Sequence, residues 1–256
     1  MDIGVCLPPD AIKTEIDGLA FVEPTVKDLL CPDQDDAEFA RRLEALAECP
    51  YPAPAVNCLF PGSLKTTGPE VDEEAVDRWF TTVATRAKQA GVSVIVYGSG
   101  GSRKVPDGFD PDGARGQIIG HLLRLAPIAE ANDVVIVLEP LHAAECNIIT
   151  SVAEGAEIVS RVDHPHVRLL ADTYHMAKDG ETPDNIRRAG ELIVHVHAAE
   201  ADGRRPVGTA EDHRPYFAAL KEGGYDGAVS IEAKWDDIDA ELPTAIAGLR
   251  RQWEEA

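Results

Sequence analysis

The feature that most constrains this chain is a regular alternation of short apolar segments with longer amphipathic ones, the pattern of repeated βα units. Eight segments, several of them rich in Val and Ile, are predicted strands: Ile3–Leu7, Ala20–Glu23, Ala55–Leu59, Ser93–Tyr97, Val134–Glu139, Val167–Asp172, Leu192–His197 and Ala228–Glu232. Several are apolar without a break, which is typical of parallel strands covered on both faces. The 256-residue length also suits a barrel, which needs about 250 residues. We therefore predict an α/β fold, a single (β/α)8 barrel.

Between the predicted strands, apolar residues recur at the three- and four-residue spacing of helices. This spacing predicts helices over Asp35–Cys49, Asp72–Ala90, Pro111–Asn132 and Asp239–Glu254. Ser151 and Glu154 have the spacing of a capping box, which predicts a further helix start. Pro8–Gly18 leaves room for only a short helix in the first unit. No linker or low-complexity segment interrupts the chain, so residues 1–256 are expected to form one domain.

The net charge of −21 argues against nucleic acid and anionic membranes as partners, because an acidic surface repels phosphate. The apolar segments are also far shorter than a membrane span, and no signal peptide is evident at the N-terminus. The five cysteines include no C-x-x-C pair, which favours a reducing compartment. We expect a cytoplasmic protein without a nucleic-acid or membrane partner.

Four strong metal-ligand residues stand at the C-terminal ends of the last four predicted strands: Glu139, Asp172, His197 and Glu232. They are separated by 33, 25 and 35 residues, about one βα unit each, and in a barrel such strand ends meet at one rim. A single strand-end acid more often caps the next helix, but four in phase make that interpretation poor. Three carboxylates and one imidazole suit one divalent metal, Mn²⁺ first, with Mg²⁺, Co²⁺ or Zn²⁺ as alternatives. A cation would also relieve the repulsion among the buried carboxylates.

Several short motifs between Phe60 and Glu232 are weak signals singly but specific in combination. They are Phe60-Pro61-Gly62, Val96-Tyr97-Gly98-Ser99-Gly100-Gly101-Ser102-Arg103, Glu139-Pro140-Leu141 with Glu145-Cys146-Asn147, Asp172-Thr173-Tyr174-His175-Met176, His195-Val196-His197 and Ser230-Ile231-Glu232. In this combination the chain resembles the xylose-isomerase-like TIM-barrel superfamily of sugar isomerases and epimerases. Within that superfamily it resembles D-tagatose/D-psicose 3-epimerases and hydroxypyruvate isomerases. The resemblance implies that Glu139, Asp172, His197 and Glu232 bind the metal and that Glu145, His175 and Arg204 contact substrate oxygens. It also implies a homo-oligomer.

The sequence positions of the three predicted substrate contacts support their roles to different degrees. His175 follows Asp172 by three residues in the loop after the sixth predicted strand, where it should face the barrel mouth. Glu145 follows Glu139 by six residues and could reach over the rim. Each of these two is alternatively an ordinary exposed loop residue. Arg204 lies in a loop where the family usually has proline at the position of Val207, so Arg205 is the alternative contact.

Three further features have weaker interpretations. His195 shares the side-chain phase of His197 and is expected to lie one layer deeper rather than to bind metal. Glu23, at the end of the second predicted strand, is a candidate pocket residue. The glycine-rich Gly98–Arg103 segment lacks the signatures of nucleotide-binding loops, so it predicts a tight turn near the substrate. Arg103 there is expected either to bind an anionic group or to form a structural salt bridge.

Together these features predict a divalent-metal-dependent isomerase or epimerase of a ketose or related hydroxy-carbonyl sugar. The metal would stabilise a developing enediolate while Glu139 and Glu232 remove and return the proton. Two bases on opposite faces would give epimerisation, and one base serving two neighbouring carbons would give aldose–ketose isomerisation. On the same site, the alternatives are dehydration of a keto-sugar or inosose and cleavage of a 3-keto-glycoside.

Two other classes of protein remain as alternatives. A DNA-repair enzyme of the endonuclease IV type shares the barrel but needs histidines on early strands, where this chain offers Glu23, Asn57 and Gly98. A non-catalytic binding barrel would retain the same metal ligands. The sequence does not determine which sugar is bound, or whether it is phosphorylated.

Overall fold

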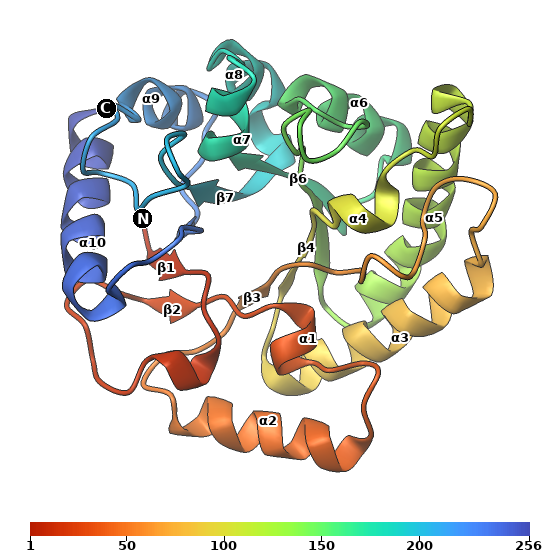
Figure 1. Cartoon of the computed structure of the whole chain (residues 1–256), viewed down its shortest axis with the longest axis horizontal. Helices are drawn as coiled ribbons and strands as arrows, with labels where there is room; N and C mark the ends of the chain where they lie inside the picture. Colours follow the sequence, from red (N-terminus) through yellow and green to blue (C-terminus); the bar gives the residue numbers. More distant parts are fainter.

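The computed structural model describes residues 1–256 and contains one parallel sheet of eight strands in the order β2-β1-β8-β7-β6-β5-β4-β3. The strands are β1 Ile3–Val5, β2 Phe21–Val22, β3 Ala55–Val56, β4 Val94–Tyr97, β5 Val135–Leu138, β6 Val167–Asp172, β7 Ile193–Ala198 and β8 Val229–Ile231. All eight fall at predicted strands, and the helices surround them (Figure 1). The prediction of a (β/α)8 barrel is therefore confirmed.

Two short strands, β2 and β3, form the seam where the barrel closes. Thr25 and Asn57 make an isolated parallel bridge just beyond these strands. The Asn57 carbonyl accepts from the Val26 N–H at 2.8 Å, and the Asn57 N–H donates to the Pro24 carbonyl at 3.0 Å. Prolines 24, 52 and 54 flank the seam and lack the N–H that a longer ladder needs. This explains why β2 and β3 have only two residues each.

The helices are α1 Val26–Leu29, α2 Asp36–Glu48, α3 Glu73–Ala90, α4 Gly100–Arg103, α5 Pro111–Ala131, α6 Val152–Val162, α7 Thr173–Lys178, α8 Asp184–Ala189, α9 Arg214–Glu222 and α10 Ile238–Glu255, with 3₁₀ turns η1 Pro9–Ala11 and η2 Gly190–Leu192. The four predicted long helices are confirmed to within one residue at each end, and η1 is the short helix of the first unit. The sequence pattern did not indicate α1, α4, α7, α8 and α9. Four of these are six residues or shorter, too short for a helical period to be visible.

The predicted capping of α6 is present with one difference. The Ser151 hydroxyl accepts from the Glu154 N–H at 3.1 Å, as a capping box requires. The Glu154 carboxylate, however, accepts from the N–H of Thr150 at 2.7 Å instead of the N–H of Ser151. The helix start is thus correctly predicted, and the reciprocal bond is shifted by one residue.

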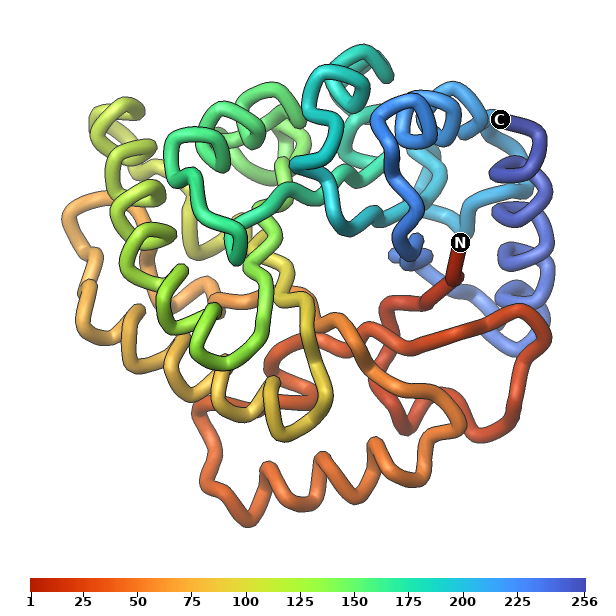
Figure 2. Tube along the Cα trace, turned by 180° about the vertical axis from the view of Figure 1, so that it is seen from behind, coloured from red at the N-terminus to blue at the C-terminus, as the bar shows by residue number.

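The N- and C-terminal units lie side by side, because β8 pairs with β1 through Ile3–Val229 and the two following residue pairs. Figures 1 and 2 show α10 beside the first βα unit, viewed from opposite sides. A hydrogen bond from the Arg250 guanidinium to the Gly18 carbonyl, at 3.2 Å, links the two units. No helix is both long enough and apolar enough to cross a membrane.

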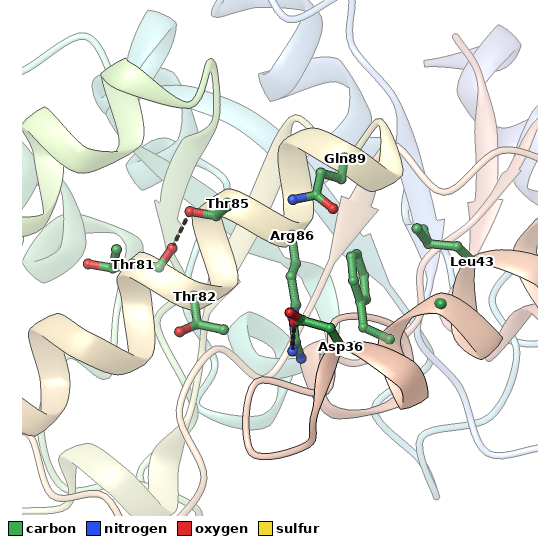
Figure 3. A pocket seen from close by; sticks show the side chains of 9 residues that line it. Asp36, Leu43, Thr81, Thr82, Thr85, Arg86 and Gln89 are labelled. Atoms are coloured by element: carbon green, nitrogen blue, oxygen red, sulfur yellow. Dashed lines mark hydrogen bonds and ion pairs between the residues drawn. The ribbon is translucent and has the colours of Figure 1, made fainter.

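Outside the β2–β3 seam, a groove of about 480 Å³ runs between α2 and α3 (Figure 3). Arg86 of α3 lies in its floor with only 7% of its side chain exposed. Its guanidinium donates to the carbonyls of Leu30 and Cys31 at 3.0 and 2.6 Å and pairs with Asp36 at 2.9 Å. Arg86 therefore fastens the segment between α1 and α2 to α3 across the outside of the seam.

The apolar core divides into two parts. The larger part contains 62 buried residues, many of them between the sheet and the helices. The smaller consists of Val96, Val137 and Leu170, which alternate with strand residues of the larger part and therefore face the barrel interior. Along β5 and β6, Glu139 and Asp172 continue the phase of Val137 and Leu170. The two acids are thus directed into the mouth of the barrel.

Candidate active site

The four predicted metal ligands lie together at the C-terminal rim of the sheet. Glu139 and Glu232 directly follow β5 and β8, Asp172 ends β6, and His197 is the penultimate residue of β7. One ligand atom from each lies within 4.8 Å of the others. Asp172 and His197 are register partners on adjacent strands, so their proximity follows directly from strand pairing.

The four ligand atoms share an unusual state. Glu139 Oε1, Asp172 Oδ2, His197 Nδ1 and Glu232 Oε2 are buried, and none makes a well-aligned hydrogen bond. Arg204 Nη2 and His197 Nδ1 do approach Glu232 Oε2, at 2.7 and 2.9 Å. Buried polar atoms almost always have a partner, and leaving them without one costs free energy. Four such atoms converge on one point, and the set contains three carboxylate oxygens and one imidazole nitrogen. These donors fit a divalent cation.

Burial shifts the pKa values of the site carboxyls. It raises the pKa of Asp172 to about 6, with further help from the charge of Glu232. It also raises the pKa of Glu139. Burial alone would raise the pKa of Glu232 too, but His197 and Arg204 outweigh it and hold that pKa below its usual value. Without a metal, the pKa values of the two glutamates are thus shifted in opposite directions.

A buried carboxylate supports His197 from behind. Glu23 accepts from Nε2 of His197 at 2.7 Å, from Nε2 of His195 at 2.8 Å and from the Ser230 hydroxyl at 2.5 Å. The charges of His197 and His195 hold the pKa of Glu23 well below its usual range against the effect of burial. A metal bound at Nδ1 would displace the proton from that nitrogen, and the proton on Nε2 would stay with Glu23. Glu23, a pocket candidate from the sequence, therefore lies behind the pocket, and His195 lies deeper, as predicted.

A cavity of about 230 Å³ opens next to the four ligand atoms. Its lining is mostly polar or glycine: Asn57, Cys58, Phe60, Ser99, Gly100, Gly101, Glu139, Leu141, Glu145, His175, Arg204 and Glu232. All three predicted substrate contacts are in this set. The Asn57 Oδ1 atom is buried there without a hydrogen-bond partner, so Asn57 adds another acceptor to the lining.

Of the two candidate arginines, Arg204 is the one at the site. Its Nη2 lies 2.7 Å from Glu232 Oε2 and 3.5 Å from Asp172 Oδ2, and its guanidinium lies 4.6 Å from the centre of the Tyr174 ring. Arg205 is largely exposed and pairs with Asp202 at 2.7 Å. The positive charge of Arg204 thus faces the carboxylates, while Arg205 points away from them.

His175 and Glu145 lie at different depths. His175 is buried, with Nε2 3.5 Å from Asp172 Oδ2 and 4.0 Å from Glu139 Oε1. Burial lowers its pKa. Glu145 is 42% exposed and lies 3.7 Å from His142 Nδ1. His175 is therefore at the floor of the pocket and Glu145 at its edge.

The glycine-rich segment shapes the site in a way that the sequence did not indicate. A Cβ atom at Gly98 would lie 2.0 Å from Glu139 Oε2, so only glycine leaves room for that carboxylate. Arg103 is fully buried and donates to the carbonyls of Tyr97 at 2.8 Å and Glu139 at 2.5 Å. The expectation of an anion contact or a salt bridge is wrong for Arg103, which instead holds together the ends of β4 and β5.

Comparisons with known proteins agree with this fold. A family model described as xylose isomerase-like TIM barrel matches residues 13–253. L-ribulose 3-epimerase from Methylomonas sp. is 30% identical over 145 residues, 56% of this chain and 50% of that protein. D-psicose 3-epimerase from Enterocloster bolteae is 30% identical over 124 residues, 48% of this chain and 41% of that protein. The chain thus spans about half the length of the curated relatives it matches.

Solved structures show the same fold over nearly the full length. D-allulose 3-epimerase from Methylomonas sp., in complex with D-allulose, has a TM-score of 0.82 at 20% identity and covers 98% of this chain and 97% of its own. The IOLI protein with a binding zinc atom has a TM-score of 0.72 at 19% identity, covering 100% and 97%. At these identities the likeness concerns the fold alone.

Proposed function

Because the chain belongs to the xylose isomerase-like TIM barrel family, we propose that it is a divalent-metal-dependent epimerase or isomerase of a ketose or a related hydroxy-carbonyl sugar. One observation carries the proposal: four buried ligand atoms, one each from Glu139, Asp172, His197 and Glu232, converge without well-aligned hydrogen bonds beside a polar cavity. The sugar epimerases among the curated relatives support the substrate class.

A divalent cation bound by these four residues would act as a Lewis acid toward the carbonyl group of the sugar. The three carboxylates and one imidazole favour Mn²⁺ or Mg²⁺, with Co²⁺ and Zn²⁺ as alternatives. His197 is prepared for such a role because Glu23 occupies its other ring nitrogen. The proposal therefore assigns the four residues to metal binding and Glu23 to the support of His197.

In this proposal, Glu139 and Glu232 move the proton at the carbon next to the carbonyl. Both carboxylates border the same cavity, as a pair that removes and returns one proton requires. Arg204 is close to Glu232 and Asp172, where its charge would offset negative charge that develops on the substrate. His175 and Glu145 line the same cavity and would hold sugar hydroxyls.

The experiment that tests the proposal follows hydrogen at carbon. Protein loaded with Mn²⁺, with occupancy measured by elemental analysis, is incubated in D₂O with D-psicose, D-tagatose and L-ribulose, and NMR locates the deuterium. Deuterium at C3 together with the C3 epimer identifies epimerisation, deuterium at C2 of an aldose product identifies isomerisation, and loss of water identifies a dehydratase. Fully loaded protein that exchanges no carbon-bound hydrogen in any sugar would refute the proposal.

We further propose that residues 1–256 act as one domain within a homo-oligomer whose ligand is a small sugar. The net charge of −21 continues to oppose nucleic-acid binding. Light scattering coupled to size-exclusion chromatography measures the assembly, and a gel-shift assay with abasic duplex DNA tests the opposing possibility.

A further inference from the structure

A second group of metal-ligating side chains lies beside the first and consists of His142, Glu145 and His175. Its geometry differs from that of the proposed metal centre. The Nδ1 atoms of His142 and His175 are 2.8 Å apart, a hydrogen-bond distance. The ring centres are 5.0 Å apart with 24° between the ring planes, so the two rings meet edge to edge. None of its ring nitrogens or carboxylate oxygens is a buried atom without a partner. This group is therefore complete as a hydrogen-bonded pair and does not require a cation.

The backbone identifies the donor of that pair. The His142 N–H donates to Nδ1 of His175 at 3.2 Å, so this nitrogen must carry a lone pair and no proton. It follows that the hydrogen between the two rings belongs to Nδ1 of His142, and that the single lone pair of His175 Nδ1 is shared between two donors, the closer of which is the His142 ring. A neutral imidazole has one N–H, so the proton of His175 is on Nε2. That atom lies 3.5 Å from Asp172 Oδ2 and 4.0 Å from Glu139 Oε1.

The backbone of His142 is itself held in place. Its carbonyl accepts from the N–H groups of Glu145 and Cys146 at 2.9 and 3.2 Å, closing a turn after β5. The adjacent Ala143 N–H donates to Asp179 at 2.7 Å. The His142 ring is buried and packs edge-on against Tyr174, with ring centres 5.5 Å apart. This loop therefore holds the backbone N–H and the Nδ1–H of His142 so that both point to the same acceptor, Nδ1 of His175.

We propose that His142 is a positioning residue, which holds His175 in the tautomer with its proton on Nε2 and so presents an N–H donor to a sugar oxygen in the cavity. The substrate part of this inference rests on the proposed function, while the tautomer does not. The carboxylate oxygens in front of His175 lie 3.5 and 4.0 Å from its Nε2, too far to fix the ring by a hydrogen bond. The contact from His142 fixes it instead.

Two substitutions of His142 distinguish the effect of its N–H donor from the effect of its size. His142→Asn retains an N–H close to the position of Nδ1, whereas His142→Leu has similar bulk and no donor. Long-range ¹H–¹⁵N NMR of the histidine rings, recorded on metal-free and Mg²⁺-loaded protein, reports which nitrogen of His175 is protonated. We expect the Nε2–H tautomer in the wild type and in His142→Asn, and a mixture of tautomers in His142→Leu. With Mn²⁺ and D-psicose, KM should rise about threefold to tenfold in the Leu variant, the effect of one hydrogen bond, and the Asn variant should restore it.

A His175 proton on Nδ1 in the wild type, or an unchanged Nε2–H tautomer in His142→Leu, would overturn the inference. If His142→Leu does not fold, the tautomer of His175 in the wild type and in His142→Asn still tests the inference, because a proton on Nδ1 in either protein would contradict it. Absence of turnover in the wild type would instead count against the proposed function, because the tautomer is read without substrate.

Discussion

Nε2 of His197 lies 2.7 Å from Glu23 Oε1, although the two residues are 174 positions apart in the sequence. The contact crosses the barrel interior from the end of β2 to β7. It directs Nδ1 of His197 toward Glu139 and Glu232, which lie 3.4 and 2.9 Å from it. The first half of the chain thereby controls a ligand of the second half.

Glu23→Gln tests this support. The neutral amide accepts less strongly and can present an N–H to one of the two imidazoles, so we expect Mn²⁺ affinity to fall about 10- to 100-fold, as for other partners of metal-bound histidines. Titration against a competing chelator measures the dissociation constant. Glu130→Gln, an exposed acid on α5, is the control. Equal affinity in Glu23→Gln and the control would contradict the assigned role.

Glu139→Gln tests the proton-transfer role. We expect turnover to fall by at least about 10²–10⁴-fold, the usual contribution of an acid–base group, with circular dichroism and the melting temperature close to wild type. The assay uses saturating Mn²⁺ with measured occupancy, because the same change weakens a ligand. A fully loaded variant with near-normal turnover would show that Glu139 does not transfer the proton.

Asp172→Asn tests the charge balance of the metal-free site. Burial, and then the charge of Glu232, raises the pKa of Asp172 from 3.8 to about 6, so its ionised form destabilises the folded state. The stability linked to this carboxyl is fully present below about pH 4 and is lost as the pH rises through about 6. In EDTA at pH 7, we therefore expect Asp172→Asn to unfold at higher urea than the wild type, by on the order of 2 kcal/mol. The difference should vanish near pH 4 and reverse with Mn²⁺ at pH 7; the same difference at both pH values in EDTA would disprove this account.

Gly98→Ala tests the space beside Glu139. The added Cβ would lie 2.0 Å from Glu139 Oε2, so the carboxylate must move away from the ligand cluster. Mn²⁺ affinity and turnover should both fall at least about tenfold, because ligand geometry governs binding. Gly116→Ala on α5 is the matched control, since nothing lies within 4 Å of its Cβ, and there we expect unchanged activity and a gain in stability of up to about 1 kcal/mol. Equal behaviour of the two variants would refute the argument.

Arg204 and Arg205 form a natural pair of variants. Arg204→Ala removes the cation next to Glu232 and Asp172, and kcat/KM for D-psicose should fall by about 10²-fold or more, the range for one electrostatic group at a reacting centre. Arg205→Ala removes an exposed ion pair with Asp202 and should change kcat/KM by less than about twofold. The reverse order of effects would place Arg205 at the substrate.

The barrel could be predicted from the sequence because Val- and Ile-rich segments such as Val167–Asp172 repeat at intervals of one βα unit. The sequence also predicted that Glu139, Asp172, His197 and Glu232 lie at one rim, since the ends of parallel strands in a barrel share an edge. Their roles in metal binding and catalysis remain predictions.

Contacts between distant segments were not predictable in this way. The bond from Glu23 to His197 depends on how β2 faces β7 across the interior. The roles of Arg103 and His142 depend on the aim of a side chain and of a backbone N–H, and neither leaves a periodic signal. The helix α9 begins at Arg214 with a proline next, within a loop-rich segment where no strong helical pattern stands out.

The Thr25–Asn57 bridge completes the circumference of the barrel, while the Asn57 side chain borders the cavity. A molecule that occupies the cavity and bonds to Asn57 Oδ1 would therefore also stabilise the pairing of β2 with β3. Ligand binding and closure of the barrel thus depend on the same asparagine.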